Sequence, residues 1–489
     1  MAFGRSAVLA CALLAASPAR AADLSAAQAA ALEAQLHNWL SSLLEPAFAL
    51  PARPVQLTAD GDHLDVVLFV PGLEGNATAV ARPGELGTWL VSDIHMPTPA
   101  SVSFELPIKD GKRINQHTGW TIGEQQGRMV VNPALGVVTS SSFALHGVDV
   151  RSDSELGHSR THYDSYAGES AATPTGNGRL NITQSARAEG MTVHSETDDK
   201  PPFDLTVRRF SGHGDLTGVD PARAGRAFAA SVKLVAATMA AASTMNTPHD
   251  PKQLPPMDRE AVRALLVALN DLAVSGQIVE TADDLSLRGL DQEVTLAHAA
   301  IGLGVEAPGG MLRASIKLAM DGFGAPQLPQ QYAGFVPRRI ALEPMISGIH
   351  TTDLNALLMA ATEPEAKPQA MAPAIAKIFA DGGVTVGLEN VRIETAETTL
   401  SGATEVRLSG PQSWQGVARV RASGFDALMD RIKADPTLSQ ALPFLVLARG
   451  LAKPDGDGLA WDIAFDETKK VVVNGTDLSR IAGGGGQRQ

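Results

Sequence analysis

Residues 312–320 read Leu-Arg-Ala-Ser-Ile-Lys-Leu-Ala-Met, with an apolar side chain at every second position and Arg313, Ser315 and Lys317 between them. Successive side chains of a β-strand point to opposite faces, so a period of two predicts a strand with one apolar and one polar face. We expect the apolar face to be buried and the polar face to meet water, as in an antiparallel sheet.

The same alternation runs through residues 54–218 and predicts an antiparallel meander there. Val55, Leu57 and Ala59 alternate with polar residues up to Asp60-Gly61, a dipeptide typical of tight turns, and residues 64–70 return as the partner strand. Further apolar segments follow at 102–108, 143–150, 180–193 and 203–207. Beyond residue 320 the pattern returns at 384–386, 391–393, 406–408 and 417–421, and in a last hairpin at 459–465 and 471–474.

Helices are expected between these strand series. Leucines at 32, 36, 40 and 43 predict an amphipathic helix over 24–45. Asp220 followed by Pro221 is a typical helix start, because the carboxylate accepts from open amides and proline has no amide to satisfy. An apolar stripe lies on the helix that follows: Phe228, Val232, Val235 and Met239. Further helices are predicted at 258–274, where Gly276 is a candidate stop, and at 352–362, 373–381, after Phe425, and at 437–451.

Three strand series end in the same short pattern of a glycine, an apolar residue and a polar helix opener. The three copies are Gly218-Val219-Asp220, Gly348-Ile349-His350 and Gly424-Phe425-Asp426. Their repetition predicts a module of meander plus covering helix, although the uneven spacing excludes a strict solenoid. The predicted fold class is therefore α+β, rich in β-strand, with repeated meander–helix modules.

The first residues predict export. Arg5 supplies a positive n-region, residues 6–16 an apolar h-region, and Ala19-Arg20-Ala21 a cleavage pattern, so we expect residues 1–21 to be a signal peptide cut near Ala21/Ala22. As a helix this h-region rises only about 16 Å, too short for a hydrocarbon core of about 30 Å. Cys11 is the only cysteine. We therefore expect a mature chain without disulfides in the periplasm.

The charge balance disfavours nucleic acid as a partner. The chain carries 40 Lys+Arg against 53 Asp+Glu, a net charge of −13, and removal of Arg5 and Arg20 leaves 38 against 53, or −15. Non-specific nucleic-acid binding needs clustered cations, which this balance disfavours. No later stretch of the sequence is apolar over the length that a transmembrane helix needs.

These patterns give a domain plan. Residues 22–245 are expected to form an N-terminal helix and a β-meander domain that closes with a helix, followed by a Pro-rich linker at 246–256. A second strand–helix module is expected at 257–363 and a C-terminal module at 364–482. Residues 483–489, which include a glycine run, are expected to be a flexible tail.

Two stretches of the C-terminal module share a pattern with a known family. Residues 415–428 read Gln-Gly-Val-Ala-Arg-Val-Arg-Ala-Ser-Gly-Phe-Asp-Ala-Leu, and residues 458–465 read Gly-Leu-Ala-Trp-Asp-Ile-Ala-Phe before Val-Val-Asn-Gly-Thr-Asp-Leu at 472–478. They resemble AsmA-like bacterial envelope proteins over about residues 380–480. The whole chain resembles a family of alphaproteobacterial periplasmic proteins that share a domain of unknown function.

The resemblance implies long, curved antiparallel sheets with helices at their ends or along one side. In that group such grooves are associated with lipid handling between the envelope membranes. This chain lacks the family's usual N-terminal membrane anchor, which argues against a membrane-bridging role and leaves a soluble carrier or accessory protein. The repeated apolar face would then line a groove for acyl chains, since each buried methylene contributes about 0.8 kcal/mol. The alternative, that helices cover the face and make it ordinary core, stays open.

Two histidine-bearing segments invite a metal or hydrolase interpretation. In a strand, His158 and His162 lie about 13 Å apart, too far to share a zinc ion. Ser211, His213 and Asp215 are alternate strand residues about 6.6 Å apart, beyond the hydrogen-bond reach of a catalytic triad. No Gly-x-Ser-x-Gly elbow accompanies them. We expect both segments to be polar strand faces.

Carboxylate pairs receive a similar interpretation. Asp198-Asp199 and Asp283-Asp284 are expected beside exposed turns, where their pKa values would not be separated by burial. Asp455-Gly456-Asp457-Gly458 lacks the twelfth-position glutamate of a calcium loop and is expected to be a hairpin turn. We therefore expect no catalytic, cofactor-binding or metal-binding residues and no enzyme activity.

The leading hypothesis is a periplasmic lipid-binding or envelope-maintenance protein whose ligand is phospholipid or another envelope lipid. The alternative is a structural or assembly partner of a cell-envelope complex, without a ligand groove and with sheet edges that contact envelope proteins.

Overall fold

The computed structural model describes residues 24–44, 53–69, 74–107, 113–133, 135, 137–197, 200–244, 259–270, 272–289, 292–362, 368–380, 382–410, 412–435, 438–468 and 470–478. The signal peptide, linker and tail of the domain plan lie outside these residues. Two compact units divide the chain: an N-terminal unit, Met1–Gly276 with Leu287–Leu290 and Thr362–Pro364, and a C-terminal unit, Gln277–Ser286, Asp291–Ala361 and Glu365–Gln489. Strand accounts for about 60% of the structure. The β-rich character of the predicted fold is confirmed.

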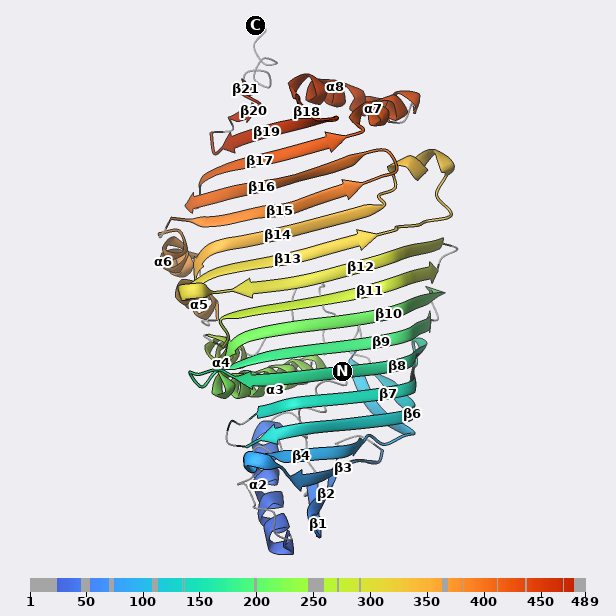
Figure 1. Ribbon diagram of the computed structural model, residues 1–489, viewed down its shortest axis with the longest axis vertical. Helices are drawn as coiled ribbons and strands as arrows, with labels where there is room; N and C mark the ends of the chain where they lie inside the picture. The colour runs from blue at the N-terminus through green and yellow to red at the C-terminus, as the bar shows by residue number, and fades with distance from the viewer. Residues whose placement is uncertain are drawn as a thin grey trace. The chain divides into compact units, whose positions relative to one another are not determined.

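The N-terminal unit is an antiparallel meander (Figure 1). Four short strands pair in chain order: β1 (Val55–Asp60), β2 (His63–Phe69), β3 (Asn76–Pro83) and β4 (Trp89–His95). β4 and β5 (Ala100–Pro107) share one edge of the long strand β6 (Arg113–Asn132). From β6 the meander continues through β7 (Val137–Ser154), β8 (Gly157–Pro174), β9 (Leu180–Thr197) and β10 (Lys200–Val219). The meander predicted for residues 54–218 is confirmed.

The core of this unit lies between α2 (Ala26–Leu44) and the short strands. Leu36 and Leu40 are almost fully buried, together with Leu64 and Val91 from the sheet. The predicted amphipathic helix is therefore confirmed, and apolar burial of its leucine stripe supplies its stability.

Two further helices follow β10. α3 (Pro221–Thr244) begins as predicted, because the Asp220 carboxylate accepts a hydrogen bond from the Arg223 amide at 3.0 Å. The side chains of its predicted stripe from Val232 onward lie outside the described residues. α4 (Arg259–Leu269) ends five residues before residue 274, the predicted end of this helix.

The predicted C-terminus of α4 at residue 274 is wrong. The Asp220 amide donates to the Leu272 carbonyl at 2.9 Å, and the Val274 amide donates to the Thr217 carbonyl at 2.9 Å. These bonds hold the residues after α4 in extended backbone beside the end of β10. Gly276 consequently lies in β11 (Ser275–Gly289) rather than at a helix cap.

The C-terminal unit contains most of β11 and a second antiparallel meander. Its strands pair in chain order: β12 (Gln292–Glu306), β13 (Met311–Asp321), β14 (Arg339–His350), β15 (Val384–Glu394), β16 (Thr399–Gly410), β17 (Ser413–Ser423) and β19 (Gly458–Asp466). Short strands β18 (Lys453–Asp455) and β20 (Val471–Val473) share the outer edge of β19, and β21 (Thr476–Asp477) pairs with β20. The hairpin expected at 459–474 and the turn at Asp455–Gly458 are confirmed.

Helices of the C-terminal unit lie at the ends of its strands (Figure 1). α5 (Thr351–Ala361) and α6 (Pro368–Ile378) follow β14, while α7 (Phe425–Ala434) and α8 (Leu442–Leu451) follow β17. A core of Ala422, Trp461 and Val473 packs against α8 residues Ala448 and Leu451. Each helix predicted in this half of the chain is present.

The repeated glycine pattern has a backbone cause. Gly218, Gly348 and Gly424 have φ values of 66°, 86° and 69°, and each directly precedes the turn from strand into helix. A side chain is unfavourable at such angles. At Gly424 a Cβ atom would also clash with the Glu397 carbonyl oxygen. The three helix starts are confirmed, whereas helices remain few beside the strands, seven in the described residues.

Among the residues described, no helix combines the length and apolar character needed to span a membrane.

Candidate functional site

The middle of the C-terminal meander carries one continuous apolar surface, which we call the aliphatic face. Directly paired residues of neighbouring strands project to the same side of a sheet, so the strand registers define its members. They are Ala299, Ile301, Leu303 and Val305 on β12; Leu312, Ala314, Ile316, Leu318 and Met320 on β13; Ile340, Leu342, Pro344 and Ile346 on β14; Val384, Val386, Leu388, Val391 and Ile393 on β15; and Leu400, Gly402, Thr404, Val406 and Leu408 on β16. Thr404 contributes the one hydroxyl, and none of these residues is charged.

The aliphatic face is exposed over much of its extent in the described structure, although Val384 at one corner is buried. Eight of its large side chains are between 36% and 48% exposed: Ile301, Leu303, Val305, Ile316, Leu318, Met320, Val386 and Leu400. The prediction that the apolar side of 312–320 is buried is therefore wrong. Its physical reason is that the helices of this unit, as described, lie at the strand ends and not across the middles of β12–β16 (Figure 1).

The opposite side of the same strands is charged and paired. Arg313 bonds to Glu389 at 2.6 Å, and Lys317 lies 3.5 Å from Glu343. Arg339 pairs with Asp321, which raises the pKa of the guanidinium. The predicted polar face is confirmed. This sheet is thus a single layer with one aliphatic and one ionic side, whereas a sheet normally buries its apolar face.

The dimensions of the aliphatic face suit an extended apolar ligand. Five neighbouring strands at about 4.8 Å spacing give about 20 Å across, and roughly seven to ten residues along each strand give about 23–33 Å. The resulting surface of roughly 500 Å² lies at the upper end of what a monomer normally exposes. Its backbone donors and acceptors are used by the strand ladders. Chemically, the face offers dispersion contacts and apolar burial, and no group for proton transfer.

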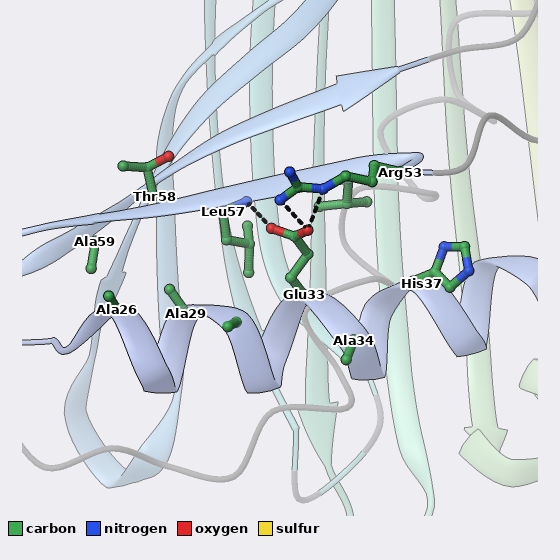
Figure 2. Close-up of a pocket in the computed structure, with 11 residues that line it drawn as sticks. Ala26, Ala29, Glu33, Ala34, His37, Arg53, Leu57, Thr58 and Ala59 are labelled. Atoms are coloured by element: carbon green, nitrogen blue, oxygen red, sulfur yellow. Dashed lines mark hydrogen bonds and ion pairs between the residues drawn. The ribbon is translucent and has the colours of Figure 1, made fainter.

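A cavity of about 420 Å³ lies between α2 and β1 in the N-terminal unit (Figure 2). The Glu33 carboxylate accepts hydrogen bonds from Arg53 at 2.6 Å and from the Leu57 amide at 3.0 Å. Much of its remaining wall is alanine, as at Ala29 and Ala34. The Glu33 network ties α2 to β1 as a structural link, whereas the buried Nδ1 of His37 in the same wall has no hydrogen-bond partner among the described residues.

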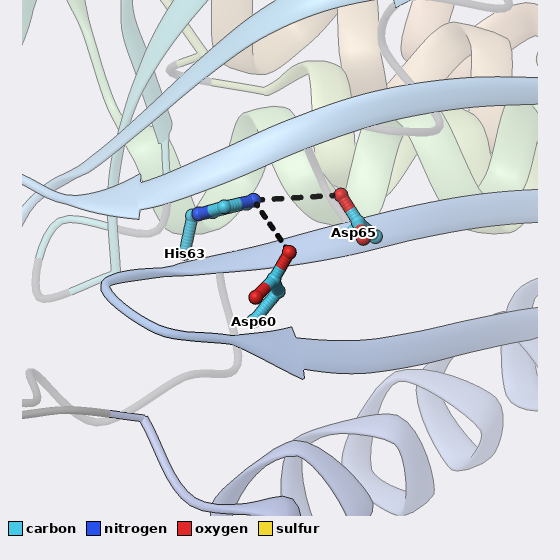
Figure 3. A group of neighbouring side chains, drawn as sticks. All are labelled: Asp60, His63 and Asp65. Carbon is cyan, nitrogen blue, oxygen red and sulfur yellow. Dashed lines mark ion pairs between the residues drawn. The ribbon is translucent and has the colours of Figure 1, made fainter.

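The hairpin of β1 and β2 gathers a group that the sequence analysis missed (Figure 3). His63 Nε2 lies 3.9 Å from an Asp60 oxygen and 3.7 Å from an Asp65 oxygen, and His63 Nδ1 lies 3.0 Å from Asp62. The hydrogen bond to His63 lowers the pKa of Asp62. Asp60, His63 and Asp65 lie close enough together to meet one metal ion. Asp60 and Asp62 are exposed, and mutual ion pairing explains the cluster. Its sequence signal is the spacing of acids around the tight turn.

His158 and His162 lie on the strand β8, as predicted. Each contacts a carboxylate rather than the other: His158 lies 2.9 Å from Glu196, and His162 lies 3.4 Å from Asp149. His213 likewise lies 2.9 Å from Asp215 on β10. Both histidine-bearing segments are therefore paired polar strand surface.

His194 on β9 has the most perturbed environment of this surface. Its Nδ1 lies 2.7 Å from Asp204 and its Nε2 lies 3.0 Å from Glu196. Hydrogen bonds to Asp204 and then to Glu196 raise the pKa of His194, and the same contact with His194 lowers the pKa of Glu196.

Asp283 and Asp284 were expected beside a turn, and this expectation is wrong. Both lie inside β11, where Asp283 is 2.7 Å from His298 of β12. Asp284 has a positive φ of 49°, so the backbone is locally irregular there, but β11 continues on both sides of it. Asp198-Asp199 lie outside the described residues.

Searches of protein families, curated proteins and solved structures give no match to the chain.

Proposed function

We propose that this chain is an exported, non-enzymatic lipid-binding protein of the cell envelope, and that the aliphatic face of its C-terminal unit holds acyl chains. The supporting observation is the exposure of eight large aliphatic side chains on one continuous sheet surface. A single-layer sheet with such a side is stabilised when a ligand covers it. Periplasmic location and curvature of the sheet over repeated modules belong to the same proposal, on the strength of the predicted signal peptide and the AsmA-like pattern.

The composition of the face favours acyl chains over a protein partner. Protein interfaces are enriched in aromatic residues and arginine at their centres. The aliphatic face contains neither on β12–β16, and its members are Ala, Val, Ile, Leu and Met with single Gly, Pro and Thr residues. Strand pairing uses the backbone groups inside the sheet, so an incoming peptide could not add as a strand there. A flexible methylene chain needs neither a polar anchor nor a free backbone edge.

The proposal predicts a dependence of affinity on chain length. Each methylene that moves from water to the face contributes about 0.8 kcal/mol, which is about fourfold in affinity at most. We therefore expect affinity to rise steadily from laurate to palmitate. A ligand recognised through its carboxylate alone would bind with the same affinity at each length, and that result would contradict the proposal.

The experiment uses the chain from Ala22 onward. Native mass spectrometry before and after organic extraction reports any co-purified phospholipid, and titration with laurate, myristate and palmitate reports the length dependence. Co-purified lipid with length-dependent rebinding supports the carrier. A ligand-free chain with a stably bound envelope protein and no fatty-acid binding would favour the assembly-partner hypothesis instead.

A further inference from the structure

The helix α8 begins with an unbroken apolar run. Residues 441–448 read Ala-Leu-Pro-Phe-Leu-Val-Leu-Ala. A run of this length covers two turns, so the first half of α8 is apolar around its whole circumference. A helix that is apolar all round is normally buried in a protein or in lipid.

One side of α8 is packed against the protein, and Leu442 and Leu445 on that side are half-buried. Ala448 and Leu451 join the core cluster around Trp461. The Trp461 indole donates to the Ala448 carbonyl at 2.7 Å, and the Asn474 amide donates to the Leu451 carbonyl at 2.8 Å. The helix is therefore fixed at its C-terminal end.

The other side of α8 is exposed around Phe444. Phe444 is 75% exposed, Val446 56% and Leu447 47%. Phe444 is the most exposed aromatic residue among the large apolar side chains described. An aromatic ring held in water on a well-anchored helix indicates a surface that is covered in use.

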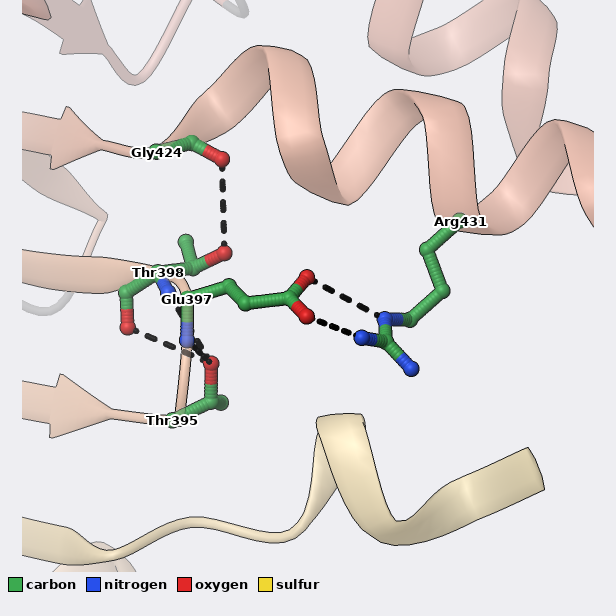
Figure 4. A network of polar contacts seen from close by, with 5 residues as sticks. All are labelled: Thr395, Glu397, Thr398, Gly424 and Arg431. Atoms are coloured by element: carbon green, nitrogen blue, oxygen red, sulfur yellow. Dashed lines mark hydrogen bonds and ion pairs between the residues drawn. The ribbon is translucent and has the colours of Figure 1, made fainter. Parts of the chain in front are cut away.

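The neighbouring helix α7 is tied to the turn between β15 and β16 (Figure 4). Arg431 of α7 pairs with Glu397 in the turn between β15 and β16, and its guanidinium lies 5.8 Å from the centre of the Phe335 ring. In the same turn the Thr398 hydroxyl donates to the Gly424 carbonyl at 3.4 Å. Arg449 of α8 is paired in turn with Asp426 of α7 at 3.0 Å. These contacts fix α7 and α8 to the strand ends.

α8 lies on the same side of the sheet as the aliphatic face. Val420 pairs with Gly402 of that face and with Trp461, and both Val420 and Trp461 belong to the cluster that packs against α8. The apolar side of the sheet thus continues from β16 through β17 and β19 to α8. The exposed side of the helix stands at the end of this apolar path.

We propose that the exposed side of α8 inserts into the surface of a phospholipid membrane and places the end of the aliphatic face beside it. This inference builds on the proposed function, because a membrane is the source from which an acyl ligand is collected. Apolar residues of a surface-bound helix enter the boundary between headgroups and acyl chains in this manner.

Two features favour a membrane over a second copy of the chain. The three exposed side chains offer on the order of 300 Å² together, well below the roughly 800 Å² per partner of a stable protein interface. The nearby charges are also neutralised in pairs, as at Arg449–Asp426 and Lys433–Asp430. With a net charge of −13 for the chain, we expect binding to a zwitterionic surface with little dependence on salt.

The test is flotation of the chain from Ala22 onward with phosphatidylcholine vesicles. The variant carries Phe444→Ser and Leu447→Ser, and the matched control carries Val267→Ser and Leu269→Ser on α4, where both side chains are also about half exposed. We expect the parent and the control to float with the vesicles and the α8 variant to partition at least tenfold less. Equal partitioning of the α8 variant and the parent, or no binding by the parent, would overturn the proposal.

Three further measurements separate the alternatives. Thermal unfolding must show that the α8 variant is folded, and a single substitution, Phe444→Ser, replaces the pair if it is not. Sedimentation must show the same oligomeric state for the parent and the variant, because loss of a dimer on substitution would assign the patch to a second copy and overturn the inference. Palmitate binding in solution must be equal in the parent and the variant. If the parent floats but binds no palmitate, the proposed function fails and membrane docking stands.

Discussion

Replacement of Ile316 by glutamate is the most direct perturbation of the aliphatic face. Ile316 lies near the middle of β13, pairs with Leu303 of β12, and is 41% exposed. An acyl chain that covers this exposed part gains about 1 kcal/mol from a side chain whose complete burial is worth about 1.5–3 kcal/mol. The variant loses this gain and also forces the ligand to desolvate a carboxylate. We expect a total loss of at least about 2 kcal/mol, or about thirtyfold in palmitate affinity.

The stability of the variant should change little, because a half-exposed position tolerates substitution within about 1 kcal/mol. Ser315→Glu is the matched control, since it adds the same charge to the same strand on the ionic side, next to Arg313 and Lys317. Palmitate titration followed by fluorescence, with chemical unfolding of each variant, checks both expectations. If Ile316→Glu binds palmitate like the parent while it remains folded, the aliphatic face is not the ligand site.

Other parts of the fold give further expectations. Gly424→Ala should destabilise the C-terminal unit by at least about 2 kcal/mol, because φ is 69° and the added Cβ meets a carbonyl oxygen. Gly450→Ala is the control, since Gly450 lies on α8 with open space around its Cβ position, and it should be neutral or stabilising. Urea unfolding compares the two variants. Asp220→Ala should lower the free energy of unfolding by about 1 kcal/mol through loss of the α3 cap. Asp220→Asn should retain most of the cap's contribution to stability. The pKa of Asp220 is lowered by the Arg223 amide, so this contribution should disappear as the pH falls through that lowered pKa. The raised pKa of His194 predicts a contribution to folding stability that is complete below about pH 6.5 and is lost as the pH rises through the raised pKa. His194→Gln should therefore remove this pH dependence of the melting temperature.

Local patterns predicted the elements well where one short-range rule determines them. The leucine stripe predicted α2, Asp220-Pro221 predicted the start of α3, and the glycine of Gly424-Phe425-Asp426 marks a backbone angle that few other residues adopt. In each case the cause lies within a few residues of the signal.

Strand lengths were harder to predict, because irregularities shift the alternation. Residues 384–386 and 391–393 were predicted as separate strand segments, and both belong to β15. The pairing of β15 shifts between Leu388 and Val391 on both of its sides, so the apolar positions change parity there. A bulge of this kind interrupts the period of two without ending the strand.

The candidate site depends on information that local sequence does not contain. The alternation at 312–320 correctly predicted which side of β13 is apolar, but coverage of that side depends on where helices distant in the sequence pack. The Asp60–His63–Asp65 group similarly arises from a hairpin register that places both strands' acids beside one histidine. Exposure of Phe444 depends on the extent of the core beneath α8.

The short strands at the outer edge of β19 have a consequence for self-association. A long strand with free amides and carbonyls can recruit another chain and start a fibre. β18 and β20 occupy separate stretches of that edge, and each is only three residues long. A second molecule therefore finds no long template on β19 for end-to-end stacking. This end of the meander therefore resists edge-to-edge polymerisation, even though the same unit carries a wide apolar surface.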